Sequence, residues 1–224
     1  GTPPGDMHYG TAYSGEEIDR MLQEGEQNLP GEDDNGHGTK VVSIAAGSLL
    51  EDLNFIGAAP ETSIAFVKLK PAKASIRRLQ QIPLDAVAYE EADMMLAVRY
   101  LDMLASELGM PLVICLALGS NSGGHTGATP LGLYLNEFAR RAGRAIAVAA
   151  GNDGNRGHHF FGVIPGTTGY LDVELRVGEG EKGFQMNLWG NTPGLFSVEV
   201  TSPAGERIPR IFARPLERQR YEFV

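Results

Sequence analysis

Apolar positions along the middle of the chain alternate between helical spacing and unbroken runs. Helical spacing is typical of an amphipathic helix, and an unbroken apolar run is typical of a strand buried on both faces. The pattern predicts, in order, a helix over Ala92–Leu108, a strand over Pro111–Leu118, a helix over Pro130–Ala142 and a strand over Ala145–Ala150. Thr129 is the expected N-cap of the second helix. This alternation predicts an α/β fold with a parallel sheet flanked by helices.

The first third of the chain predicts three further elements. Thr11–Leu22 has the composition of a short helix with Ser14 as its N-cap. Small apolar residues over Val41–Ala46 indicate a helix packed closely against its neighbours. Ser63–Leu69 alternates in polarity, which predicts a strand.

The sequence pattern changes near Phe161, where short stretches of alternating polar and apolar residues begin, separated by glycine-rich turns. Strands are predicted over Tyr170–Val177, Phe184–Trp189 and Leu195–Thr201, and a further one begins at Tyr221–Val224. This pattern predicts a partial antiparallel β-sandwich or jelly-roll region. We therefore expect two domains, an incomplete α/β core over residues 1–161 and the start of an inserted β domain over residues 162–224.

Composition and charge narrow the possible partners. The 224 residues include 19 Lys+Arg and 28 Asp+Glu, a net charge of −9, which disfavours nucleic acid or an anionic membrane as a partner. No apolar run approaches the roughly 20 residues that span a bilayer. The single cysteine, Cys115, excludes an intrachain disulfide and a cysteine-based zinc site. A chain of this mass can bury about 70% of its unfolded surface, so we expect a sizeable core.

The strongest candidate for chemistry is His37, within the segment Asn35–Val42. A histidine between two glycines at the start of a helix has a fixed backbone and an exposed ring, as a general base requires. The alternative is a surface histidine in a flexible loop. Ligands of parallel sheets bind beyond the carboxyl ends of the strands, which here are Gly119-Ser120 and Gly151-Asn152. We expect the site there.

Three segments accompany the histidine in a fixed order: Gly57–Thr62, Ala117–Ser120 and Ala147–Asn152. Together with Asn35–Val42 they resemble the subtilisin-like serine protease family, the subtilases. The resemblance implies that His37 takes the proton of a serine nucleophile and that Asn152 donates to the oxyanion of the tetrahedral intermediate. It also implies a protein or peptide as substrate.

The same resemblance assigns substrate-binding residues on both strand ends. It places Leu118, Gly119 and Ser120 in the edge that pairs with an extended substrate, and Ala149, Ala150 and Gly151 in the wall of the pocket for the residue before the scissile bond. Small residues there allow a peptide backbone to approach and add as a strand.

Two members of the family's triad have no counterpart in the sequence. Asp33 and Asp34 follow no buried strand and are expected to be solvated loop charges, and the sequence contains no Gly-Thr-Ser. Gly166–Thr168 is the nearest match to that motif, but it is expected in a turn. We therefore expect a fragment of a serine endopeptidase whose catalytic Asp and Ser lie outside this chain, so that the chain alone is inactive.

The β region resembles the jelly-roll insertion of the clostridial germination-protease (Csp-like) branch of subtilases. That resemblance implies an extracellular or spore-associated location. The alternative function is a non-catalytic pseudoprotease of the same fold that binds or regulates a partner protease. Because an incomplete sheet exposes its edges, we also expect self-association or a complementing chain.

Other candidate sites are weaker. No cofactor is required for the chemistry, and a calcium loop near Glu51, Asp52 and Asn54 rests on few carboxylates. His158-His159 is a poor metal pair, because adjacent side chains diverge on extended backbone and no carboxylate cluster completes the site. Residues 119–124 suggest a nucleotide-binding loop but lack the Gly-Lys-Ser/Thr ending. His125 is expected in a solvent-exposed loop or along the substrate cleft.

Overall fold

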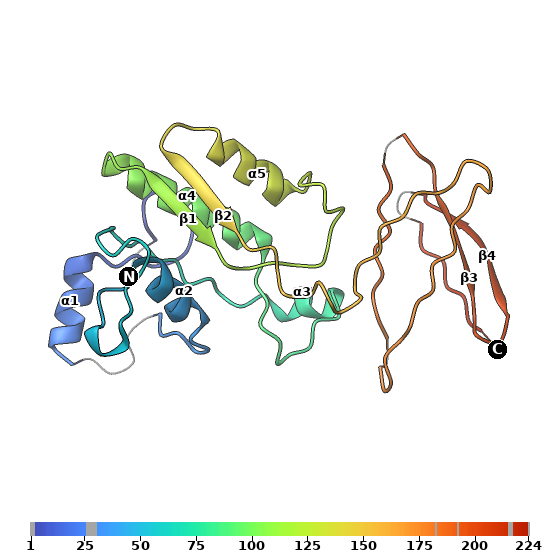
Figure 1. Cartoon of the computed structure of the whole chain (residues 1–224), viewed down its shortest axis with the longest axis horizontal. Coiled ribbons are helices and arrows are strands. Elements are labelled where there is room, and N and C mark those ends of the chain that lie inside the picture. The colour runs from blue at the N-terminus through green and yellow to red at the C-terminus, as the bar shows by residue number, and fades with distance from the viewer. Residues whose placement is uncertain (1–2, 26–30, 182, 192, 215–216, 224) are drawn as a thin grey trace.

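The computed structural model describes residues 3–25, 31–181, 183–191, 193–214 and 217–223. Figure 1 shows an elongated molecule in which the helices and the first two strands lie at one end and the last two strands at the other. In chain order the elements are α1 (Gly15–Gln23), α2 (His37–Ala46), the short 3₁₀ helix η1 (Glu51–Leu53), α3 (Ala74–Leu79), α4 (Glu91–Glu107), β1 (Leu112–Leu116), α5 (Pro130–Ala139), β2 (Arg144–Val148), β3 (Ser197–Thr201) and β4 (Arg207–Phe212).

The core of the α/β part is one face of a two-stranded parallel sheet. β1 and β2 pair in register from Leu112 opposite Arg144 to Leu116 opposite Val148. Helices α4 and α5 cover the face that carries Ile114, as Figure 1 shows. The buried cluster consists of Val98, Ile114, Leu135 and Phe138. These four come from α4, β1 and α5, so the predicted strand–helix–strand unit is confirmed, with the sheet buried on one face only.

The opposite face of the sheet is uncovered, which corrects the prediction of strands buried on both faces. Val113 is 73% exposed, and Cys115, Ala145 and Ala147 are exposed as well. Alternate residues of a strand point to opposite faces. The continuous apolar sequence therefore supplies a second apolar face that, among the described residues, no element covers.

The total accessible surface area is also larger than that of a compact monomer. The expectation of a sizeable core is therefore wrong. A folded monomer of 24.0 kDa exposes about 10,000 Å². This chain exposes 18,405 Å². It therefore buries about half of its unfolded surface instead of the expected 70% or so.

Helix starts follow the predicted capping chemistry. The hydroxyl of Ser14 accepts from the Glu17 amide at 3.2 Å, and the Glu17 carboxylate accepts from the Ser14 amide at 2.7 Å, a reciprocal capping box. Thr129 accepts from the Gly132 amide at 3.1 Å at the start of α5. Both predicted N-caps are thus confirmed.

A half-buried ion pair fixes α4 against the start of β2. Arg144 Nε lies 2.7 Å from Asp102 Oδ1 and its Nη2 lies 2.8 Å from the Ser106 hydroxyl. Arg141 also pairs with Asp102. Burial works to raise the pKa of Asp102, but hydrogen bonds from the two arginines outweigh it and hold the pKa below its usual value.

A buried carboxylate ties the N-terminal segment to α4. Asp93, 7% exposed, accepts from the Tyr9 hydroxyl and, at 2.8 Å, from Lys70 Nζ. Lys70 Nζ also lies 4.0 Å from the centre of the Tyr9 ring. Burial again works to raise the pKa of Asp93, and the hydrogen bonds from Lys70 and Tyr9 lower it overall. Residues from three distant segments therefore meet at the start of α4.

The predicted strand over Ser63–Leu69 is wrong. Residues 63–69 contain no regular secondary structure, and Phe66 is 55% exposed. A strand requires a hydrogen-bonded neighbour, and no backbone bond between described residues pairs this stretch with one. The segment still passes beside the start of α2, since a Cβ on Gly38 would lie 3.0 Å from Cζ of Phe66.

The β region contains one of the predicted strands and one that was missed. Leu195–Thr201 is confirmed as β3, which pairs antiparallel with β4 from Ser197 opposite Phe212. Tyr170–Val177 and Phe184–Trp189 are extended but form no strand, and every described residue from 151 to 191 is exposed. Alternating polarity stabilises a strand only where one face is covered, which is not the case here. Residues 221–223 are not in a strand, and Val224 lies outside the described residues.

A helix needs about 20 predominantly apolar residues to cross a bilayer. Within the described part of the chain, no helix combines the length and the apolar character that crossing a membrane requires.

Candidate active site

His37 is the first residue of α2, and its ring reaches the end of β1. Its Nε2 lies 3.0 Å from the carbonyl oxygen of Ala117, the residue after β1. Because a carbonyl can only accept, Nε2 carries the proton in this arrangement and Nδ1 is the basic nitrogen. The exposed ring therefore lies at the carboxyl end of the parallel sheet.

The loop before His37 is organised by Asp33. One carboxylate oxygen accepts from the amides of Asn35 and Gly36, and the other accepts from the Thr39 amide and hydroxyl at 2.9 and 2.8 Å. Gly36 adopts φ +72°, a left-handed conformation that suits glycine, and lets the chain turn into the helix. The carboxylate thus satisfies free amides at the start of α2 in place of an N-cap side chain.

These contacts correct the expectation that Asp33 is a solvated loop charge. The Thr39 amide and then its hydroxyl, followed by the Gly36 and Asn35 amides, lower the pKa of Asp33 from 3.8 to about 2. Hydrogen bonds to the charged form favour ionisation in this way. The sequence did contain a signal, an aspartate shortly before a helix start with a threonine beyond it, which is a pattern of side-chain-to-backbone bonding. Asp34 is exposed, as predicted, and pairs with Lys68 at 3.2 Å.

The far end of α2 is fixed by the second motif segment. The amides of Gly57, Ala58 and Ala59 donate to the carbonyls of Gly47, Ile44 and Ala45 at 2.9, 3.0 and 2.8 Å. Carbonyls in the last turn of a helix have no partner within the helix, so this segment satisfies them. Residues 57–59 therefore hold the helix that carries His37.

The two strand ends lie side by side, as the parallel register requires. The Ala149 amide donates to the Leu116 carbonyl at 3.1 Å, which places Leu118, Gly119 and Ser120 beside the segment Ala149–Asn152. Asn121 Nδ2 then donates to Asp153 Oδ2 at 3.3 Å and joins the two loops. Gly119, Ser120, Ala149, Ala150, Gly151 and Asn152 are exposed, and Leu118 is half-buried.

His37 and Asn152 thus share one edge of the sheet, but no direct contact joins them. Among the hydrogen bonds between described residues, none involves the Asn152 side chain. Its carboxamide is exposed to solvent. An exposed imidazole and an exposed carboxamide at the same end of the sheet are the kinds of group that acyl-transfer sites use.

The remaining candidates lie apart from this edge. Gly166–Thr168 is in a turn, as predicted, in which the Pro165 carbonyl accepts from the Gly169 amide at 2.9 Å. Glu51 and Asp52 lie in η1, and Asn54 follows it. In the described part of the chain, no three His, Cys, Asp or Glu side chains gather where a metal ion could bind. The assigned roles of the site residues stay predictions.

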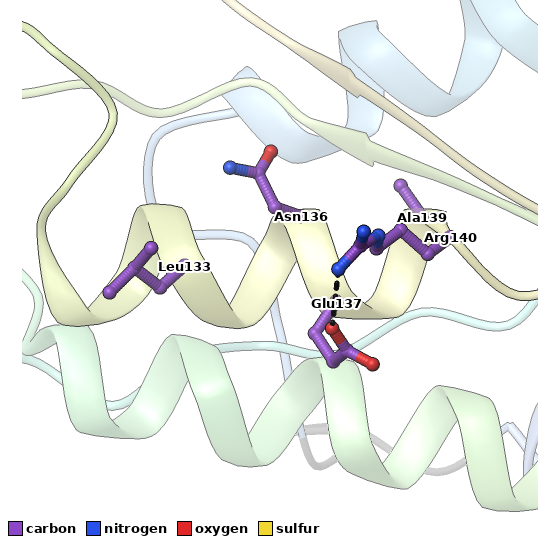
Figure 2. Close-up of a pocket in the computed structure, with 5 residues that line it drawn as sticks. All are labelled: Leu133, Asn136, Glu137, Ala139 and Arg140. Carbon is purple, nitrogen blue, oxygen red and sulfur yellow. Dashed lines mark ion pairs between the residues drawn. The ribbon is translucent and has the colours of Figure 1, made fainter.

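A shallow depression on the surface of α5 is unrelated to this site. It has a volume of about 540 Å³ and is lined by Leu133, Asn136, Glu137, Ala139 and Arg140. Figure 2 shows these five side chains on one helix, with the Glu137–Arg140 ion pair at 3.6 Å. They occupy the part of α5 that leads towards the start of β2, whereas His37 lies at the carboxyl ends of the strands.

Comparison with known proteins agrees with the α/β fold. Residues 9–174 match the Subtilase family, peptidase family S8. A solved structure of the CspB protease of Clostridium perfringens superposes with a TM-score of 0.63 at 28% sequence identity. The superposition covers 84% of this chain and 37% of that one. No curated protein sequence matches the chain.

The chain belongs to the subtilase family of serine proteases, because the family match extends over more than half of its length. Its fold is subtilisin-like α/β, followed by an antiparallel β region. It is similar to a Csp protease, as the jelly-roll resemblance predicted, and it spans little more than a third of that protein's length.

Proposed function

We propose that this chain supplies the general base and an oxyanion donor of a subtilisin-like serine endopeptidase, and that the catalytic Asp and Ser come from polypeptide outside these 224 residues. The observation that carries the proposal is the placement of the His37 ring at the Ala117 carbonyl, beside the strand end that leads to Asn152. In this proposal the chain alone does not hydrolyse peptides.

The tautomer that the Ala117 contact assigns to His37 supports a role for an outside carboxylate. With Nε2 protonated towards Ala117, Nε2 has no lone pair for a nucleophile's proton. A carboxylate that accepts the proton of Nδ1 would stabilise the other tautomer and make Nε2 the basic nitrogen. The ring would then release the Ala117 carbonyl and turn towards a serine hydroxyl. An aspartate outside this chain would in this way convert a resting histidine into a general base.

The substrate is proposed to be an extended peptide that pairs with the edge at Leu118, Gly119 and Ser120, its side chain directed at Ala149, Ala150 and Gly151. Exposed backbone on both strand ends supports this, because main-chain hydrogen bonds to a sheet edge provide affinity without a deep cavity. An extracellular or spore-associated location is proposed from the similarity to a Csp protease, and calcium near η1 is proposed from Glu51 and Asp52 alone.

The test uses the full-length polypeptide that contains this chain and two asparagine variants. Asn152→Ala is expected to lower kcat by about 10²–10³, the range for removal of one oxyanion donor, with little change in KM. Asn155→Ala, an exposed asparagine of the same segment, is the matched control and should leave kcat unchanged. His37→Ala should abolish labelling by a fluorophosphonate serine reagent.

Three results would contradict the proposal. Equal kcat for the Asn152→Ala and Asn155→Ala variants would remove the oxyanion role. A full-length protein that neither cleaves peptides nor reacts with the serine reagent would overturn the catalytic assignment and support the non-catalytic alternative. Labelling of the 224-residue chain by itself would show that the nucleophile lies within it.

A further inference from the structure

The glycine-rich loop after the substrate edge is held from two sides by residues that the proposed catalytic roles leave unused. His125 stacks on His159, with ring centroids 4.6 Å apart and planes inclined by 13°. The indole of Trp189 packs against Gly124, where a Cβ would lie 3.2 Å from Cε3 and 3.4 Å from Cδ2. The loop that begins at Gly119 thus contacts both the segment after Asn152 and the β region.

The backbone of the loop shows that these contacts constrain it. His125 has φ +52°, a left-handed conformation that costs a non-glycine residue energy unless its surroundings hold it. His125 Nε2 lies 3.3 Å from the Asn121 carbonyl, and Asn121 Nδ2 reaches Asp153 across the gap between the strand ends. The stacked pair therefore lies a few residues from Gly119 and Ser120 on one side and from Asn152 on the other.

We propose that His159 and Trp189 are positioning residues for the substrate edge, and that the His125–His159 stack makes this positioning pH-dependent. That these residues position a substrate edge rests on the proposed function, whereas the contacts that His159 and Trp189 make with the loop do not. Face-to-face rings suit neutral imidazoles. When both rings are protonated, two unit charges lie 4.6 Å apart, which even at the dielectric constant of water disfavours the stack about fivefold.

Few other charged groups lie in the segments that carry the stack. Residues 119–129 carry no charged side chain apart from His125. The segment after Asn152 carries Asp153 and Arg156, which pair with each other at 3.8 Å, and the neighbouring His158. Trp189, which packs on the loop from the β region, is uncharged. Acidification that protonates both rings should therefore separate them and release the loop.

Tryptophan fluorescence can test the proposal, because Trp189 is the only tryptophan of the chain. Its emission reports on the contact with Gly124, and the amide resonances of Gly119 and Ser120 report on the edge. In the wild-type chain we expect both signals to follow one and the same transition on acidification. His159→Phe keeps a stacked ring that cannot be protonated, so the amplitude of both transitions should fall at least threefold.

His125→Phe is the reciprocal variant and should lower the amplitude of both transitions equally. The same result in two different variants would not come from a folding defect in one of them. His158→Phe is the matched control, because it removes an adjacent histidine outside the stack and should keep the full transition. A flat pH response in the wild type, a transition that persists in both stack variants, or its loss in His158→Phe would overturn the proposal. Neither signal depends on proteolysis, so these results stand apart from the test of the catalytic role.

Discussion

Gly57 is the position at which a single methyl group should loosen the helix that carries His37. A Cβ on Gly57 would lie 2.4 Å from the amide nitrogen of Gly47 and 2.9 Å from two backbone atoms of Ala46. Ordinary contact requires about 3.5 Å, so the two backbones must separate by about 1 Å. Because the obstructing atoms belong to the backbone, no side-chain rotation relieves the overlap.

The magnitude follows from the hydrogen bonds that this movement breaks. The three amides of residues 57–59 donate to the last turn of α2 at 2.8–3.0 Å, and a separation of about 1 Å carries them beyond bonding distance. At roughly 0.5–1.5 kcal/mol each, their loss should lower the free energy of unfolding by about 2–4 kcal/mol in the Gly57→Ala variant. The exposed amides of Ala58 and Ala59 should then exchange with solvent.

Urea unfolding followed by far-UV circular dichroism measures the change, and amide hydrogen exchange locates it. Gly154→Ala is the matched control, since nothing lies within 4 Å of a Cβ there; it should leave stability unchanged or raise it by up to about 1 kcal/mol. Equal urea midpoints for Gly57→Ala and wild type, or full protection of the Ala58 and Ala59 amides in the variant, would refute the reasoning.

Two further predictions concern charge and the open sheet face. The pKa of Asp33 is lower in the folded chain than in the unfolded chain, so its stabilising effect is present above pH 4 or so and is lost as the pH falls through about 2. Asp33→Asn should remove this acid-dependent part of the stability, measured by urea unfolding at several pH values. The same pH dependence in the variant and the wild type would contradict the prediction. We also expect the apparent mass in size-exclusion chromatography to rise with concentration, and Val113→Lys on the open face to suppress the rise. Leu133→Lys, on the outer face of α5, is the control for Val113→Lys and should leave the rise in apparent mass unchanged. A constant apparent mass at all concentrations would contradict the expected self-association.

Elements set by local chemistry could be predicted from the sequence. Ser14 and Thr129 were identified as N-caps because their side chains bond amides only three residues away. The helix over Ala92–Leu108 was recognised from its apolar spacing and lies within one residue of α4. The strands β1 and β2 were recognised because each is the other's neighbour along the sheet. In each case the information lies within a short stretch or in one supersecondary unit.

Elements that depend on a distant partner could not be predicted. Ser63–Leu69 and Tyr170–Val177 alternate in polarity as strands do, but neither has a hydrogen-bonded neighbour among the described residues. β4 was missed because Pro209 and two arginines interrupt the apolar pattern; its pairing with β3 sets its structure. The role of Asp33 was missed because it depends on the turn geometry at Gly36, which residue types alone do not specify.

The His37 site is built from contacts that do not need the uncovered face of the sheet. Asp33 fixes the start of α2, residues 57–59 fix its end, and Ala117 receives the ring; all of these lie between residues 33 and 117. The exposed Val113 and Cys115 belong to the other face. A polypeptide that covered that face could therefore bring a nucleophile to a histidine already in place, and orienting two groups in advance is a large part of what a catalytic site contributes. The contacts that place His37 and the open sheet face are thus separate features of the same α/β unit.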